Sequence, residues 1–129
     1  MDRKISVLLT DESPEYGLSL INTLTSKGLD VTAVPKDGRK VLELLSSNKR
    51  YDVVLLDMLL SGLDAFEVIS RAKEMNITSK FVIISAYTSS NIEQGLYSLG
   101  ISYFFLKPFD PEVLAQRVVQ MCALQQEKK

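Results

Sequence analysis

The sequence contains no histidine and no tryptophan, and it has a single cysteine, Cys122. Without histidine the chain cannot form a Ser-His or Cys-His catalytic pair. One cysteine cannot form an internal disulfide, which is typical of a reducing compartment. We interpret Cys122 as a small packing residue of the last helix rather than as a redox sensor.

Long apolar runs and an excess of one charge are also missing. No apolar stretch approaches the ~20 residues of a membrane helix, and no secretory leader is recognisable, so we expect a cytoplasmic protein without membrane contact. The 15 Lys and Arg residues nearly cancel the 16 Asp and Glu residues. This balance gives no broad positive field, so we expect no direct binding of nucleic acid by this segment.

What remains is an ordinary globular composition, with 46% hydrophobic and 24% charged residues in a chain of 129. Domains cluster near ~100 to 150 residues, so the chain has room for one domain with its own core. We expect this domain to span residues 1–125. Residues 126–129 are either a polar tail or the start of a linker to an output domain.

Short apolar runs rich in branched residues recur along the chain, at residues 5–9, 53–56 and 81–84. They lack the alternation of a half-exposed strand, which predicts strands buried on both faces of a parallel sheet. Residues 31–34 and 103–106 are plausible partner strands. Apolar residues at helical spacing lie between and after these runs, which predicts helices that face the sheet.

Helix boundary signals support this alternation. Ser13-Pro14-Glu15 and Asp110-Pro111-Glu112 each offer an N-cap, a proline at the first helical position and an acid in the first turn. A capping box of Ser90 with Glu93 is expected at another start, and Gly28 and Gly100 are expected left-handed caps at helix ends.

Five strands alternating with five helices predict an α/β fold. Right-handed crossovers place helices on both faces of a doubly wound parallel sheet, for which we expect the flavodoxin-like strand order 2-1-3-4-5. Such sheets bind ligands at the carboxyl ends of their strands. The function therefore depends on the polar residues at those ends.

Polar side chains follow four of the five expected strands. Asp11 and Glu12 come after the first, Asp57 ends the third, Ser85 ends the fourth and Lys107 follows the fifth. Carboxylates gathered at one edge repel by about 4 kcal/mol per close pair at an effective dielectric of ~20, so they require a cation. Oxygen ligands with room for water suit Mg²⁺, with Asp11 and Glu12 as ligands.

This set of groups suits attack on phosphorus, which mainly requires in-line positioning and neutralisation of the phosphoryl oxygens. Asp57 is the expected nucleophile because it ends the central strand, with Lys107 as a fixed cation and Ser85 as a hydrogen-bond donor. Each residue taken alone has a simpler interpretation, as a helix cap, a solvated lysine or a turn serine. Their coincidence at four strand ends favours the site.

The sequence around these residues resembles one family. The strand ends read VLLTDE at 7–12, YDVVLLD at 51–57, VIISA at 82–86 and FLKPF at 105–109. They resemble the receiver domains of bacterial two-component response regulators, over essentially the whole chain. Residues 101–110 are similar in particular to the receiver halves of the sporulation master transcription regulators of spore-forming Firmicutes.

The resemblance implies a Mg²⁺-dependent switch that accepts a phosphoryl group on Asp57 from a histidine kinase or histidine phosphotransferase. It adds the backbone carbonyl of Leu59 to the metal ligands Asp11, Glu12 and Asp57. It also implies a cis peptide between Lys107 and Pro108. Such a domain phosphorylates and dephosphorylates itself and is not a turnover enzyme.

The family pattern also assigns a switch pair. Phe104 would swing inward when the hydroxyl of Ser85 is drawn to the phosphoryl group, although spacing alone equally fits a core phenylalanine. The state would be read on the fourth helix, fifth strand and fifth helix, roughly residues 91–124. The partner there would be an output domain, such as a DNA-binding domain absent from this chain, or a second copy.

The chain departs from the family after the phosphoacceptor. Receivers usually have Met-Pro and then Asp-Gly there, whereas this sequence has Leu60-Ser61 and Asp64-Ala65. Losing the proline and the glycine is expected to loosen the loop and to disfavour a positive φ at Ala65. The altered loop motivates an alternative, a receiver-like interaction module that works without phosphorylation.

Two other functions fit poorly. A haloacid-dehalogenase-like phosphatase requires a second Asp two residues after the nucleophile, where this chain has Leu59. A flavodoxin-like nucleotide binder would place a phosphate-binding loop where Asp11 and Glu12 repel phosphate.

Leu59 and Tyr87 flank the expected path of hydrolytic water and neither is an acid or base, so we predict slow self-dephosphorylation, on the order of hours.

Overall fold

The computed structural model describes residues 4–10 and 14–127. Strands and helices alternate strictly along the chain. The strands are β1 (Ser6–Thr10), β2 (Asp30–Val34), β3 (Val53–Asp57), β4 (Lys80–Ser85) and β5 (Tyr103–Leu106). The helices are α1 (Pro14–Ser26), α2 (Gly38–Leu45), α3 (Ala65–Glu74), α4 (Ser90–Ser98) and α5 (Pro111–Glu127).

The five strands form one sheet in the order β2-β1-β3-β4-β5, and every neighbouring pair is parallel. This confirms the expected α/β class and strand order. Because all strands run the same way, their carboxyl ends meet at one edge of the sheet, with β3 at its centre.

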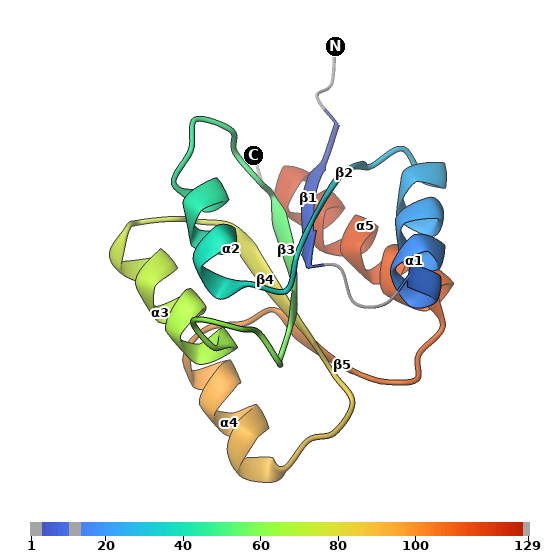
Figure 1. The fold of residues 1–129 in the computed structure, drawn as a ribbon. Coiled ribbons are helices and arrows are strands. Elements are labelled where there is room, and N and C mark those ends of the chain that lie inside the picture. The colour runs from blue at the N-terminus through green and yellow to red at the C-terminus, as the bar shows by residue number, and fades with distance from the viewer. Residues whose placement is uncertain (1–3, 11–13, 128–129) are drawn as a thin grey trace.

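Helices cover both faces of the sheet. Figure 1 shows α1 and α5 on one face and α2, α3 and α4 on the other. Successive residues of β3 supply both layers, since Val54 and Leu56 pack on the α2/α3/α4 side while Val53 and Leu55 pack on the α1/α5 side. All four are fully buried, and each buried side chain of this size stabilises the fold by about 1.5 to 3 kcal/mol.

The two-sided burial explains why the central strands read as continuous apolar runs. Every residue of β1 and β3 is buried. The edge strand β2 is only partly covered, and its sequence DVTAV carries polar residues among the apolar ones. The apolar runs therefore predicted the central strands more sharply than the edges.

Two of the expected helix starts lie within the described residues. Asp110 caps α5, since its Oδ1 accepts a hydrogen bond from the Glu112 N–H at 2.9 Å. The expected capping box of Ser90 with Glu93 is wrong by one residue. Ser89 has the extended backbone that an N-cap requires, and its hydroxyl accepts the N–H of Ile92 at 3.2 Å.

Ser90 is then the first helical residue, and the Glu93 carboxylate accepts a hydrogen bond from the Thr88 hydroxyl at 2.9 Å instead. The other expected N-cap, Ser13, lies outside the described residues.

Left-handed residues end three helices. Gly28 and Gly100 have φ values of 85° and 93°, as expected from the sequence. Asn76 does the same after α3 with a φ of 60°, and the N–H of Ile77 returns to the Ala72 carbonyl at 3.0 Å. Asparagine tolerates this conformation better than most residues, which explains why α3 ends without a glycine.

The last helix continues to Glu127, so residues 126 and 127 are helical, and the expected domain boundary after residue 125 stays a prediction. Cys122 is buried on this helix and packs with the α1/α5 core, as its interpretation as a packing residue requires. Within the described part of the chain, no helix is long and apolar enough to cross a membrane.

Candidate functional site

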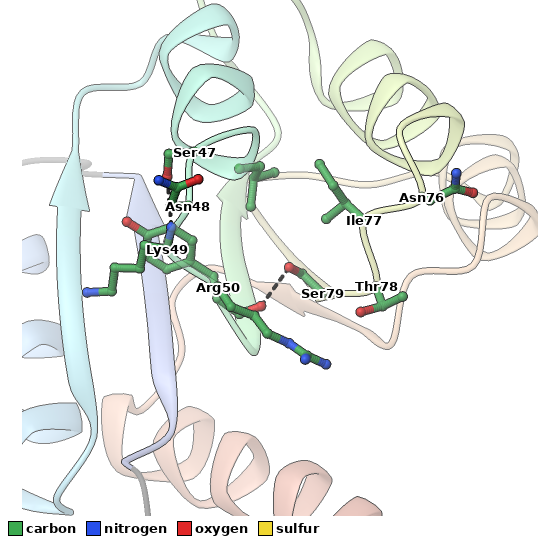
Figure 2. Close-up of a pocket in the computed structure, with 10 residues that line it drawn as sticks. Ser47, Asn48, Lys49, Arg50, Asn76, Ile77, Thr78 and Ser79 are labelled. Carbon is green, nitrogen blue, oxygen red and sulfur yellow. Dashed lines mark hydrogen bonds between the residues drawn. The ribbon is translucent and has the colours of Figure 1, made fainter.

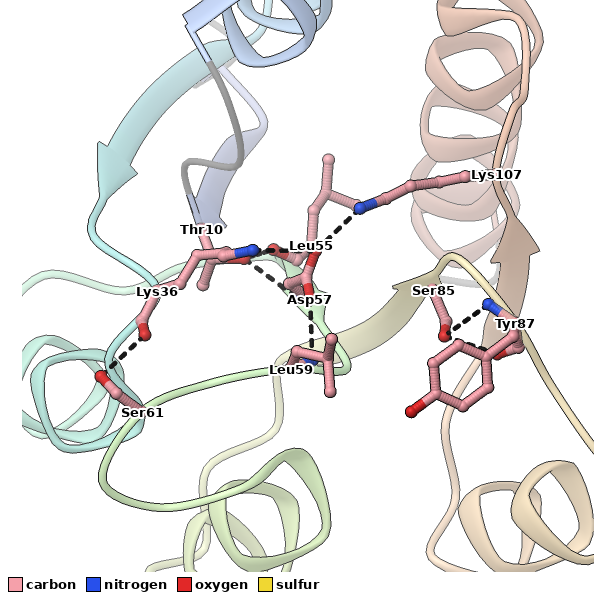
Figure 3. Close-up of polar contacts among 9 residues, drawn as sticks. All are labelled: Thr10, Lys36, Leu55, Asp57, Leu59, Ser61, Ser85, Tyr87 and Lys107. Atoms are coloured by element: carbon pink, nitrogen blue, oxygen red, sulfur yellow. Dashed lines mark hydrogen bonds and ion pairs between the residues drawn. The ribbon is translucent and has the colours of Figure 1, made fainter.

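Asp57 is the last residue of the central strand, and only 3% of it is exposed. Its position is fixed from the neighbouring strand. The Thr10 hydroxyl, at the end of β1, accepts the Asp57 N–H at 2.9 Å and donates to the Leu55 carbonyl at 3.4 Å. Figure 3 shows Thr10 beside Asp57. The candidate nucleophile is therefore held by a buried side-chain bridge between two strands.

Cations and a backbone amide surround the Asp57 carboxylate. Its Oδ1 accepts the Leu59 N–H at 2.8 Å, and its Oδ2 lies 3.2 Å from the Nζ of Lys107. The Nζ of Lys36 lies 4.0 Å from the same oxygen. A buried carboxylate requires such partners, because an uncompensated charge in the interior is costly.

Lys36 is a residue that the sequence interpretation missed. It lies two residues beyond the end of β2, the one strand at whose end no site residue was predicted. A signal was present, since all five parallel strands were expected to end at the same edge. The site thus contains two lysines, each from the segment that follows one of the two edge strands.

Lys107 follows β5 directly and is positioned through its backbone. Its N–H donates to the Ser85 carbonyl at 2.8 Å, and the peptide bond between Lys107 and Pro108 is cis, as the resemblance implied.

Ser85 ends β4 and is 2% exposed. Its hydroxyl donates to the Tyr87 carbonyl at 2.6 Å and accepts the Tyr87 N–H at 3.3 Å. Figure 3 shows this hydroxyl engaged with Tyr87 and not with Asp57. Phe104 lies on β5 opposite Ile83 in register, where it is partly buried against the α2/α3/α4 core. These are the positions from which the switch pair would have to move.

The expected metal ligands Asp11 and Glu12 lie outside the described residues. Thr10, immediately before them, is hydrogen-bonded to Asp57. Among the described residues no group of three or more His, Cys, Asp or Glu side chains could hold a metal ion. The described donors are the Asp57 carboxylate and the Leu59 carbonyl, and an all-oxygen set of this kind fits Mg²⁺ once both acids are added.

The loop from Asp57 to α3 is anchored rather than loosened by its unusual residues. The Ser61 N–H and hydroxyl both donate to the Lys36 carbonyl, at 2.9 and 3.1 Å. Asp64 caps α3 by accepting the Glu67 N–H at 2.9 Å, and Ala65 is simply the first helical residue. The positive φ of this loop, 76°, falls on Gly62, so Ala65 requires none.

Large side chains are exposed on the face formed by α4, β5 and α5. Tyr97, Leu106 and Val113 are 46%, 47% and 51% exposed, and Tyr87 lies just before α4. The pKa of Tyr97 is raised by partial desolvation and, to a lesser degree, by the Glu93 carboxylate and Tyr103, while a backbone hydrogen bond with Phe104 acts in the opposite direction. Tyr97 therefore stays protonated and neutral at physiological pH.

A hollow lies at the opposite, amino end of the strands. It has a volume of about 270 Å³ and is lined by Leu45 and by residues 47–51 and 76–79, as Figure 2 shows. A hydrogen bond of 2.6 Å from the Ser79 hydroxyl to the Tyr51 carbonyl closes part of its wall. None of the sequence-predicted site residues lies there.

Solved structures of the same fold cover nearly the whole chain. A CheY-like receiver domain from Methanospirillum hungatei superposes with a TM-score of 0.87 at 17% identity, covering 98% of this chain and 100% of that one. The receiver domain of the Francisella response regulator 1452 gives 0.81 at 28% identity, with 98% and 100% covered. Chemotaxis response regulator CheY4 of Vibrio cholerae gives 0.80 at 23% identity, with 92% and 98% covered.

These comparisons do not support the closer resemblance to sporulation master regulators. They do agree with the wider family. The sequence profile of the response regulator receiver domain matches residues 7–119. With that match and the fold just described, this chain belongs to the response regulator receiver family and is a receiver domain of the two-component type.

Proposed function

We propose that this chain is a phosphorylation-activated switch that accepts a phosphoryl group on Asp57 from a histidine kinase or histidine phosphotransferase. The observation that carries this proposal is the Asp57 carboxylate, 3% exposed at the end of the central strand and flanked by two lysines. One cation is enough to balance the single charge of a buried carboxylate, and here a second lysine lies at the same sheet edge, where parallel sheets bind ligands. We also propose that the switch acts in the cytoplasm.

The reaction would be a direct displacement at phosphorus. An electron pair of the Asp57 carboxylate forms a new bond to phosphorus, and the bond from phosphorus to the donor's nitrogen or oxygen breaks, with its electron pair leaving on the donor. Lys107, 3.2 Å from Oδ2, would neutralise charge on the phosphoryl oxygens. Ser85 would donate its hydroxyl to one of them.

Asp11, Glu12, Asp57 and the Leu59 carbonyl would hold Mg²⁺ in this proposal. When bound, the ion would offset the negative charge that the clustered carboxylates and the phosphoryl group bring together. The requirement follows from charge, because a third or fourth negative group cannot join the site without further compensation.

The phosphorylated aspartate carries a charge of about −1.5 to −2 where the carboxylate carried −1, and it brings new acceptor oxygens. The Ser85 hydroxyl would leave the Tyr87 carbonyl for one of these oxygens, and Phe104 would then move inward on β5. Both positions lie next to the exposed α4, β5 and α5 surface. This surface would carry the signal to an output domain or to a second copy.

A DNA-binding output domain, and with it a role in transcription, belongs to this proposal. The full-length gene product would distinguish a transcription regulator from a stand-alone receiver.

Incubation with Mg²⁺ and acetyl phosphate followed by intact mass spectrometry tests the proposal. We expect a mass increase of one phosphoryl group that disappears in Asp57→Asn and in excess chelator. The rival function, an interaction module that works without phosphorylation, predicts no adduct under any of these conditions. An adduct that persists in Asp57→Asn would show that another residue is the phosphoacceptor.

A further inference from the structure

Two ammonium groups share one oxygen of Asp57. The Nζ of Lys107 lies 3.2 Å and that of Lys36 lies 4.0 Å from Oδ2, and these lysines come from the segments after β5 and β2 respectively. Figure 3 shows the two side chains reaching the carboxylate from different sides. The side chain of Lys36 is 33% exposed, so its charge is partly shielded from water and still accessible to an incoming group.

The backbone of Lys36 is fixed by Ser61 from the next loop. The Lys36 carbonyl accepts both the Ser61 N–H, at 2.9 Å, and the Ser61 hydroxyl, at 3.1 Å. The Ser61 carbonyl in turn accepts the N–H of Gly38 at 2.9 Å, and Asp37 pairs with Ser61 in a short parallel bridge. The segment carrying Lys36 is therefore tied to the loop that follows Asp57.

Close packing reinforces this tie. A Cβ atom at Gly38 would collide with the Leu63 carbonyl, so the two segments approach as closely as only a glycine allows. A proline at position 61 would remove both bonds to the Lys36 carbonyl, because it has neither an N–H nor a hydroxyl. Serine at this position therefore supplies two bonds that fix the backbone of Lys36, of which the hydroxyl bond is specific to its side chain.

We propose that Lys36 is a second cationic contact for the phosphoryl group on Asp57, and that Ser61 is the positioning residue that holds it there. The inference rests on the proposed function and adds a residue to the same site. A carboxylate carries one negative charge, whereas its phosphorylated form carries about −1.5 to −2 on three accessible oxygens. A second ammonium therefore interacts more strongly with the transition state and product than with the free carboxylate.

A purely structural role for Lys36 makes a different prediction. If Lys36 only balanced the buried Asp57 charge, its removal would lower stability and leave phosphorylation unchanged. If it contacts the phosphoryl group, its removal slows transfer from acetyl phosphate, in which a P–O bond to Asp57 forms as the P–O bond to acetate breaks. The electron pair of that broken bond leaves with acetate.

The experiment compares Lys36→Met with Lys40→Met in the full chain with Mg²⁺ and acetyl phosphate at low salt. Lys40 is 50% exposed and pairs with Glu43 at 3.0 Å on α2, so both variants lose one positive charge from the same region. We expect the initial rate to fall about five- to tenfold in Lys36→Met and to stay unchanged in Lys40→Met. Lys36→Arg should restore at least half of the rate.

A binding measurement tests whether Lys36 contacts the phosphoryl group, independently of the rate of phosphoryl transfer. Beryllium fluoride mimics the phosphoryl group without covalent transfer, and its affinity in the presence of Mg²⁺ can be titrated by fluorine NMR. We expect Lys36→Met to weaken this binding by the same factor as the rate, about five- to tenfold.

Ser61→Pro tests the positioning role. It should lower the rate in the parent chain but cause no further loss in the Lys36→Met background, because both changes remove the same contact. An equal loss in both backgrounds would overturn the role of Ser61. Rates of Lys36→Met within twofold of the parent would overturn the role of Lys36, whereas a parent chain that forms no adduct would overturn the proposed function and this inference with it.

Discussion

Two aspartates lie at opposite ends of the central strand, Asp52 just before β3 and Asp57 as its last residue, and their carboxylates accept hydrogen bonds from different backbone amides. The Asp52 carboxylate accepts the N–H of Ser6 at 2.8 Å. Its backbone N–H donates to the Ser6 carbonyl at 2.8 Å, and its carbonyl accepts the Lys80 N–H at 2.9 Å. Asp52 therefore extends the hydrogen bonding of the sheet to both neighbouring strands.

Asp57 uses its carboxylate differently. Its backbone N–H is bound by Thr10, while the carboxylate meets one backbone amide and two lysines. An aspartate at the amino end of β3 thus binds the backbone of the neighbouring strand, whereas an aspartate at its carboxyl end meets two ammonium groups. The two aspartates differ because they lie at opposite ends of the same strand, and ligands of parallel sheets bind at the carboxyl ends of the strands.

The largest expected effect is on phosphorylation, which should depend on Asp57 and not on Asp52. Asp57→Asn should abolish the adduct formed with acetyl phosphate, because the amide is not a nucleophile toward phosphorus. Asp52→Ala should form the adduct at a rate within about twofold of the parent, since it lies at the far end of the strand. A complete loss in Asp52→Ala, in a chain that remains folded by circular dichroism, would contradict the comparison.

A smaller effect concerns the lifetime of the phosphorylated form. Leu59 is 57% exposed two residues after Asp57, and Tyr87 is equally exposed beyond Ser85. Replacing Leu59 with Asn places a group that can orient water near the phosphoryl group, so we expect decay to speed up about tenfold, or 1.4 kcal/mol in the barrier. The decay is followed by loss of the phosphorylated mass after the donor is removed.

The matched control for the lifetime is Leu18→Asn, at another exposed leucine, 59% exposed on α1. Its decay rate should equal that of the parent chain, which we expect to be slow, on the order of hours. A parent lifetime of seconds, or no change in Leu59→Asn, would show that hydrolysis does not depend on this position.

The smallest expected effect is on stability, and it concerns Asp52. Asp52→Ala leaves the part-buried N–H of Ser6 without its carboxylate acceptor, which costs about 1 to 3 kcal/mol in the free energy of unfolding. Urea denaturation measures this change, with the midpoint lowered and the slope unchanged. If Asp52→Ala is as stable as the parent, the carboxylate contributes no net stability to the sheet.

Much of this molecule was predictable because burial leaves a clear pattern. The apolar runs of β1, β3 and β4 predicted the sheet, and the polar residues at the ends of β3, β4 and β5 predicted Asp57, Ser85 and Lys107 at one edge. Asp57 and Lys107 are indeed in contact, at 3.2 Å. Ser85 reaches the same edge, but the direction of its hydroxyl is set by the Tyr87 backbone, and no sequence pattern encodes that choice.

The residues that escaped prediction depend on contacts between loops. Lys36 and Ser61 are 25 positions apart, and each is unremarkable alone. Their roles arise only where two loops are tied together by backbone hydrogen bonds. The N-cap of α4 was displaced by one residue for a related reason, since Thr88, Ser89 and Ser90 are all polar and backbone geometry selects among them.

The hydrogen bond between the Ser85 hydroxyl and the Tyr87 carbonyl, 2.6 Å long, has a consequence for the resting state. A hydroxyl that already has a good acceptor gains only the difference between two bonds when it changes partner, which is less than the roughly 1.5 to 3 kcal/mol of a hydrogen bond to a charged group. The exchange at Ser85 would therefore supply only part of the free energy that favours the active conformation. The rest would have to come from the other contacts of the phosphoryl group.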